Sequence, residues 1–169
     1  IEAAAVWMAY ITAYGALIDI ANVGKGDAVV IPAASSSVGL AAIQIVNSVG
    51  AISIATTRTN AKVSALKSAG AAHVVATEEQ DLVKSINTIT NGKGARIVFD
   101  PIGGQGVDKL AQATSPGGTL LLYGGLSLEP TIFPVASAFM KGLSLRGYTL
   151  FEIVSDTARR EAAIAFVTK

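Results

Sequence analysis

Cysteine is absent from the 169 residues, and charged residues are scarce. The absence of cysteine excludes a disulfide scaffold, a zinc site built on thiolates and a cysteine nucleophile within this sequence. Asp, Glu, Lys and Arg make up 15% of the chain, against about 25% in an average soluble domain. The formal net charge of +1 offers no electrostatic surface for nucleic acid or an anionic membrane.

Hydrophobic residues are abundant instead, at 51% of the chain, which excludes intrinsic disorder and favours one compact domain over residues 1–169. The longest charge-free run, residues 28–57, has the length of a membrane span, but Pro32 and three consecutive serines interrupt it. We interpret it as strand, turn, helix and strand. The chain begins at Ile1 without a basic leader, so we expect part of a longer cytoplasmic protein.

Apolar, β-branched runs recur at intervals of 22 to 25 residues, at 28–31, 51–55, 73–75, 96–99, 119–122 and 144–145. Their lack of alternation is typical of strands covered on both faces. Helical periodicity lies between them at 38–49, 60–69 and 78–90, where Thr77 is the candidate N-cap. The pattern predicts an α/β fold: a Rossmann-type, doubly wound, six-stranded parallel sheet with helices on both faces. A leading helix at 2–22 and a trailing helix at 155–169 flank the core, 27–151.

The turn after the first strand runs directly into a helix, where free amides and the helix dipole favour a pyrophosphate. A dinucleotide fingerprint would place glycine at positions 34, 36 and 39, and only Gly39 is glycine. The candidate phosphate-binding residues are Ala34, Ser35, Ser36, Ser37, Val38 and Gly39. Serine hydroxyls would supply hydrogen bonds where glycine is missing. Alternatively, this is a small-residue turn that binds nothing.

The end of the second strand carries Thr57, Arg58 and Lys62 but no carboxylate. An acidic residue there would bind both ribose hydroxyls of NAD, whereas arginine makes paired bonds to a phosphate. The sequence therefore favours NADP(H) over NAD(H), with these three residues at the 2′-phosphate. The alternative is that the two cations lie on an ordinary solvated helix start.

Four segments together resemble the cofactor domain of the medium-chain dehydrogenases/reductases, in the zinc-independent quinone oxidoreductase branch: residues 12–17, 38–44, 99–104 and 122–125. The resemblance covers the whole chain. It implies that Thr12 lies by the nicotinamide. It also implies that two loops cover the nicotinamide ribose and ring: Asp100, Pro101, Ile102 and Gly103, and Gly124, Gly125, Leu126 and Ser127. The alternative for the second loop is a simple turn at its two glycines.

Zinc-dependent relatives carry a cysteine ligand where this sequence has Met8. Because a thioether is a poor zinc ligand, we expect no metal site. The family's N-terminal catalytic domain is not in this sequence, so no catalytic residue is assigned. His73, the single histidine, is expected to be structural or exposed. Tyrosine followed four residues later by lysine, a P-loop and a ribose-binding acid are all missing, which disfavours short-chain reductases, P-loop enzymes and methyltransferases.

We therefore expect the NADPH-binding domain of a zinc-free oxidoreductase that transfers hydride to a small molecule, a quinone or other α,β-unsaturated carbonyl compound. Residues 143–151 form an expected edge strand, through which relatives dimerise, so a homodimer is expected. Two alternatives remain open. One is a non-catalytic nucleotide-binding or dimerisation module, and the other is a domain of a zinc-dependent alcohol dehydrogenase.

Overall fold

The structure, a computed structural model, describes residues 2–168, and the side chains of residues 7–168. Within them, six strands form one parallel sheet in the order β3-β2-β1-β4-β5-β6. They are β1 (Ala28–Ile31), β2 (Ile52–Thr57), β3 (His73–Ala76), β4 (Ala95–Asp100), β5 (Thr114–Leu122) and β6 (Ser144–Gly147). The chain therefore proceeds outward from β1 in two directions, and the switch point lies between β1 and β4. The expected doubly wound α/β sheet is confirmed.

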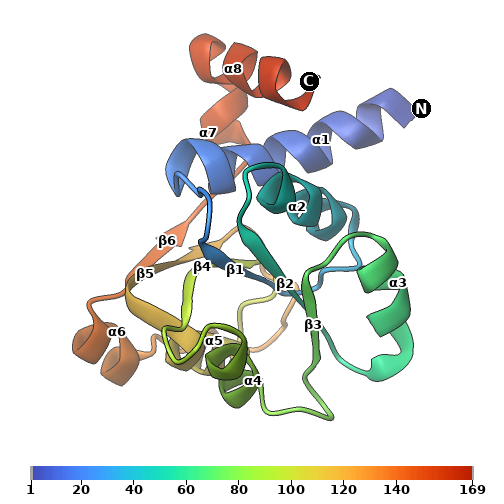
Figure 1. Ribbon diagram of the computed structural model, residues 1–169. Coiled ribbons are helices and arrows are strands. Elements are labelled where there is room, and N and C mark those ends of the chain that lie inside the picture. Colours follow the sequence, from blue (N-terminus) through green and yellow to red (C-terminus); the bar gives the residue numbers. More distant parts are fainter. Residues whose placement is uncertain (1, 169) are drawn as a thin grey trace.

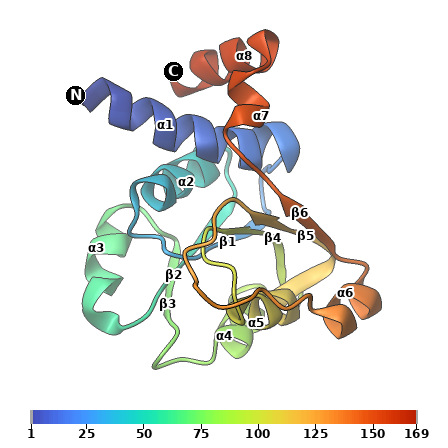
Figure 2. The ribbon, with the colours of Figure 1, turned by 180° about the vertical axis from the view of Figure 1, so that it is seen from behind.

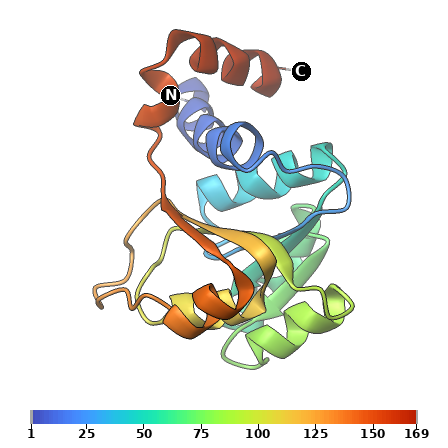
Figure 3. The ribbon, with the colours of Figure 1, turned by 90° about the vertical axis from the view of Figure 1, so that its left-hand side faces the viewer.

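Helices cover both faces of the sheet (Figures 1 and 2). On one face lie α1 (Glu2–Tyr14), α2 (Ser37–Ser48) and, after the short η2 (Asn60–Lys62), α3 (Val63–Ser68). On the other face lie α4 (Leu82–Ile89), α5 (Gly106–Ala113) and α6 (Val135–Lys141). Figure 3 shows α7 (Phe151–Val154) and α8 (Thr157–Val167) stacked beyond α1 as an outer layer.

Burial on both faces explains why the sequence has so little charge. Every residue of β1 is buried, and side chains of alternate strand positions enter two separate apolar clusters, one under each layer of helices. The charge-free run 28–57 is β1, the turn, α2 and β2, as expected. Within residues 2–168, no helix is both long and apolar enough to span a bilayer.

The leading helix departs from the expected 2–22. It is α-helical to Tyr14 and continues as a π-helix, η1 (Gly15–Ile20). A Cβ at position 15 would overlap the side chain of Ile153 and the hydroxyl of Tyr148, so glycine is needed where η1 begins. The expected trailing helix, 155–169, is α8, which is shorter because it begins at Thr157 and ends at Val167; residue 169 lies outside the described residues.

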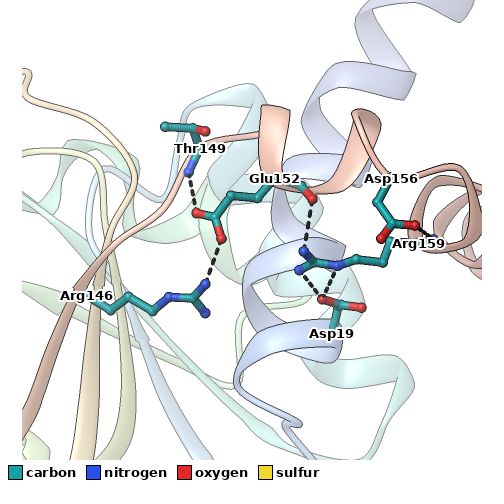
Figure 4. Close-up of polar contacts among 6 residues, drawn as sticks. All are labelled: Asp19, Arg146, Thr149, Glu152, Asp156 and Arg159. Atoms are coloured by element: carbon teal, nitrogen blue, oxygen red, sulfur yellow. Dashed lines mark hydrogen bonds and ion pairs between the residues drawn. The ribbon is translucent and has the colours of Figure 1, made fainter.

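Ion pairs join these terminal elements (Figure 4). The Arg159 guanidinium on α8 binds the Asp19 carboxylate on η1 and donates to the Glu152 carbonyl on α7 at 2.9 Å. Arg146 on β6 lies 2.6 Å from the Glu152 carboxylate. Segments that are 140 residues apart in the sequence are thereby tied together.

Two further expected boundaries are wrong. Helix α4 begins at Leu82 rather than Glu78, because Asp81 is its N-cap and accepts from the Lys84 amide at 2.7 Å. Thr77 is not a cap, since its hydroxyl donates to a carbonyl of β2. Strand β6 does lie at the sheet edge, but it ends at Gly147, far short of the expected 151, because the chain turns into α7.

Candidate functional site

The turn after β1 leads directly into α2, whose N-cap is Ser36. The Ser36 hydroxyl accepts a hydrogen bond from the Gly39 amide at 3.1 Å. A Cβ at Gly39 would lie 2.6 Å from the Ala34 carbonyl oxygen, so helix and turn pack too closely for any side chain there. This confirms that Gly39 is required for close packing, as its place in the fingerprint predicts.

The first turn of α2 retains two amides for an external acceptor. In the described part of the chain, the amides of Ser37 and Val38 make no hydrogen bond, while the Leu40 amide already donates to the Ser36 carbonyl. The Ser37 side chain is exposed and that of Val38 half-buried. Two free N–H groups at the positive end of a twelve-residue helix can donate hydrogen bonds to a phosphate.

A cavity of about 440 Å³ lies beside this turn at the carboxyl end of β2. Its lining residues are Ala33, Ser35, Thr56, Thr57, Arg58, Lys62, Thr77, Ile102 and Leu126. Two cations line it, and no lining residue among the described side chains carries a carboxylate. The Lys62 ammonium crosses from η2 to the Ser35 hydroxyl at 3.0 Å. The structure thus brings together six predicted site residues: Ser35, Thr57, Arg58, Lys62, Ile102 and Leu126.

The loops after β4 and β5 also lie side by side. The Leu126 amide donates to the Pro101 carbonyl at 3.0 Å, and the Ser127 amide to the Ile102 carbonyl at 2.8 Å. A Cβ at Gly124 would lie 2.7 Å from the Pro101 carbonyl oxygen, so glycine is needed for this approach. The two loops predicted to cover the nicotinamide end therefore form one continuous wall.

Asp100 has a different local role from the one its position suggests. Its side chain is fully buried, and its carboxylate oxygens accept from the amides of Ile102 at 2.8 Å and Gly103 at 3.1 Å. Burial raises the pKa of this carboxyl, and the two amides partly oppose that shift. The carboxylate therefore shapes the loop, and any ligand contact from this residue would come from its backbone.

Tyr123 at the end of β5 is a residue that the sequence reasoning missed. Its ring stacks on Phe99, with centroids 3.9 Å apart, and its buried hydroxyl has no hydrogen-bond partner among the described residues. Burial raises the pKa of this phenol, as does the nearby Asp100 charge, while proximity to the Ser36 side chain lowers it. A polar atom behind the phosphate turn is thus left unsatisfied by the protein. The signal was a tyrosine placed directly before Gly124.

Thr12, by contrast, does not join these residues. It is buried on α1, donates to the Met8 carbonyl at 2.6 Å, and does not line the cavity beside the turn. The Met8 side chain is 58% exposed. His73 is exposed at the start of β3. A larger groove of about 1000 Å³ lies between α4 and α5, and it shares Thr56, Thr77 and Ile102 with the cavity; sequence reasoning did not anticipate it.

Comparisons with known proteins agree with this fold. Residues 37–169 match the family described as zinc-binding dehydrogenase. The mitochondrial enoyl-[acyl-carrier-protein] reductase of Homo sapiens is 32% identical over 86% of this chain and 40% of its own length. A 2-haloacrylate reductase superposes with a TM-score of 0.91 at 25% identity, covering 99% of this chain and 52% of that one.

The quinone oxidoreductase of Escherichia coli, solved with NADPH, superposes with a TM-score of 0.86 at 25% identity. The match covers 95% of this chain and 49% of that protein. The chain thus spans about half the length of these structural neighbours. On the family match and the shared fold, the chain belongs to the zinc-binding dehydrogenase family, within the medium-chain dehydrogenase/reductase superfamily.

Proposed function

We propose that this chain is the NADPH-binding domain of an oxidoreductase that reduces a quinone or another α,β-unsaturated carbonyl compound. The observation that carries the cofactor preference is the cavity at the end of β2. Arg58 and Lys62 line it, and no lining residue among those described carries a carboxylate, which supports an adenosine 2′-phosphate there. Thr57 and Ser35 add hydroxyls to the same wall.

Further residues of the candidate site support binding of a dinucleotide. The free amides of Ser37 and Val38 would hold the pyrophosphate, and Ala34 and Gly39 allow the close approach of α2 to the turn. The wall built by Pro101, Ile102 and Gly103 with Gly124, Gly125, Leu126 and Ser127 would cover the nicotinamide ribose and ring. We assign Thr12 to the nicotinamide end only by family resemblance.

When bound, the nicotinamide supplies a hydride. The residues of this domain would orient the dinucleotide and exclude water, because the cofactor itself carries the reaction. No residue here is assigned as a general acid or base. The hydride acceptor would bind in a cleft between this domain and a second, N-terminal domain. The matched structural neighbours are about twice the length of this chain, which is long enough for such a domain.

The names of the relatives support the substrate class. These relatives are named an enoyl reductase, a 2-haloacrylate reductase and a quinone oxidoreductase, and enoyl groups, haloacrylates and quinones each contain a carbon–carbon double bond next to a carbonyl or carboxylate group. We further propose that the reaction needs no zinc, because Met8 occupies the position of a zinc-ligand cysteine and a thioether binds zinc poorly.

A homodimer through the sheet edge is also proposed. Strand β6 has one free edge, and α6, which leads into it, exposes Phe139 at 83% and Met140 at 77%. An unpaired strand beside exposed apolar side chains is typical of a pairing surface. The expected result is the elution volume of a dimer in size-exclusion chromatography with light scattering at micromolar concentration.

The cofactor proposal is tested by calorimetric titration of NADPH and NADH into the wild type, Arg58→Gln and Lys62→Gln. Each substitution removes a charged contact to phosphate, so each should weaken NADPH binding by about tenfold or more and leave NADH binding unchanged. Lys67→Gln is the matched control, because Lys67 lies on α3 outside the cavity. Equal weakening of both nucleotides would count against the 2′-phosphate assignment.

A further inference from the structure

Two donors beside the proposed phosphate position already bond to serine hydroxyls of the turn itself. The Gly39 amide donates to the Ser36 hydroxyl at 3.1 Å, and the Lys62 ammonium donates to the Ser35 hydroxyl at 3.0 Å. Both serine residues are exposed. In each contact the serine oxygen accepts the hydrogen bond, as a bound phosphate oxygen would.

The two contacts differ in how strongly they exclude a ligand. An amide has one proton, so the bond from Gly39 to Ser36 weakens any bond from that amide to a second acceptor. An ammonium has three protons, so Lys62 can hold Ser35 and a phosphate together. Ser36 is therefore the stronger competitor of the two.

The backbone does not require serine at this position. Ser36 has φ −75° and ψ 163°, an extended conformation open to any residue. Glycine at this position of the fingerprint would leave the Gly39 amide without a side-chain cap. The difference from the fingerprint thus lies in the hydroxyl and its contact, and not in backbone strain.

We propose that the Ser36 hydroxyl is an internal competitor of the nucleotide phosphate. It caps α2 in the free protein and must leave the Gly39 amide before a phosphate oxygen can take that position. This inference rests on the proposed nucleotide site. As a consequence, the Ser36 hydroxyl stabilises the free domain but weakens nucleotide binding. Loss of the hydroxyl should therefore lower the stability and raise the affinity.

The alternative is that Ser36 links the Gly39 amide to the phosphate. Its hydroxyl could keep the bond from Gly39 and donate its own proton to the phosphate. In that arrangement, loss of the hydroxyl lowers stability and affinity together, whereas competition moves them in opposite directions. The sign of the affinity change therefore separates the two arrangements.

The test uses Ser36→Ala and Ser36→Gly, with NADPH dissociation constants from calorimetry and melting temperatures measured without nucleotide. Competition predicts that both variants bind NADPH about fivefold more tightly, the factor that corresponds to a typical N-cap contact. Ser36→Ala should also melt at a lower temperature, and Ser36→Gly should lose less because glycine is an acceptable N-cap.

Asp156→Ala is the matched control, because Asp156 caps α8 through the Arg159 amide at 3.1 Å, away from the turn. It should melt lower without a change in NADPH affinity. Weaker binding by both Ser36 variants, with a wild type that binds, would overturn the competition and leave the proposed function standing. Absence of NADPH binding by the wild type and by both variants would overturn the nucleotide site itself, and the competition with it.

Discussion

The Lys62 ammonium donates to the Ser35 hydroxyl across 3.0 Å and so joins the turn after β1 to the segment after β2. These are the two segments that any dinucleotide bound at the switch point would have to bridge, one at its pyrophosphate and one at its adenosine ribose. Their contact in the free protein shows that the two halves of the candidate site are already aligned. Lys62 also adds a positive charge to the cavity lining.

The packing of α2 on the turn can be tested at Gly39. Gly39→Ala would place a Cβ 2.6 Å from the Ala34 carbonyl oxygen, which is backbone and cannot move aside. We expect a loss of about 1–3 kcal/mol in the free energy of unfolding, as is typical of overpacking, together with weaker NADPH binding. Urea unfolding measures the first effect and calorimetry the second.

Gly24→Ala is the control, since a Cβ there meets nothing within 4 Å. It should change the free energy of unfolding by less than about 0.5 kcal/mol. If Gly39→Ala is as stable as Gly24→Ala, then α2 does not approach the turn after β1 as closely as described.

The unsatisfied hydroxyl of Tyr123 gives a second prediction. Tyr123→Phe removes a buried polar atom that has no partner and keeps the ring on Phe99. We expect the free energy of unfolding to rise by about 1 kcal/mol in the absence of nucleotide. Tyr10→Phe should do the reverse, because the Tyr10 hydroxyl donates to the Gln44 side chain. Destabilisation of both variants would indicate a partner for Tyr123.

Asp100 gives a pH-dependent prediction. Its pKa is raised in the folded state, so the native protein binds this proton more readily than the unfolded chain does. The stability that wild-type Asp100 contributes is thus fully present below the unfolded pKa of about 3.9 and is lost as pH rises through the folded value. Asn has one acceptor oxygen for two amides, so Asp100→Asn should be less stable throughout.

The comparison isolates this one group, because all other titrating residues are shared. The free-energy difference between wild type and Asp100→Asn, from urea unfolding, should be larger at about pH 4 than at about pH 7. A difference that grows with pH would mean that the two amide bonds outweigh burial and that the pKa is lowered.

The ion pair between Arg159 and Asp19 predicts how α8 is held. Arg159→Met removes the contacts to Asp19 and to the Glu152 carbonyl, and should cost about 1 kcal/mol of unfolding free energy at low salt. The loss should shrink at high ionic strength. Arg160→Met, which removes only a 3.2 Å bond to the Val154 carbonyl, should be close to neutral. Equal effects would mean that the ion pair contributes nothing.

Much of the fold could be predicted because parallel strands that are buried on both faces have sequences of short apolar runs. The doubly wound parallel sheet, the edge position of β6 and the packing role of Gly39 all follow from that pattern and from turn chemistry. The start of α4 could not, since Thr77 and Asp81 are both good N-caps and the choice depends on a bond from Thr77 to β2.

Contacts within the site were harder to predict than its location. The burial of Asp100 depends on how the loop curls through Gly103 and Gly104, which both have positive φ. The bond between Lys62 and Ser35 joins two segments whose spacing only the folded sheet sets. The Ser36 cap, by contrast, could have been predicted, because serine before a helix is a common N-cap. The exposure of Phe139 and Met140 could not, since apolar residues usually indicate burial.

The most direct test of the central claim is the ratio of the NADH and NADPH dissociation constants of the wild-type chain, measured by calorimetry under one set of conditions. Contacts from Arg58 and Lys62 to a 2′-phosphate predict that NADPH binds at least about tenfold more tightly. Equal affinities, or tighter binding of NADH, would contradict the account.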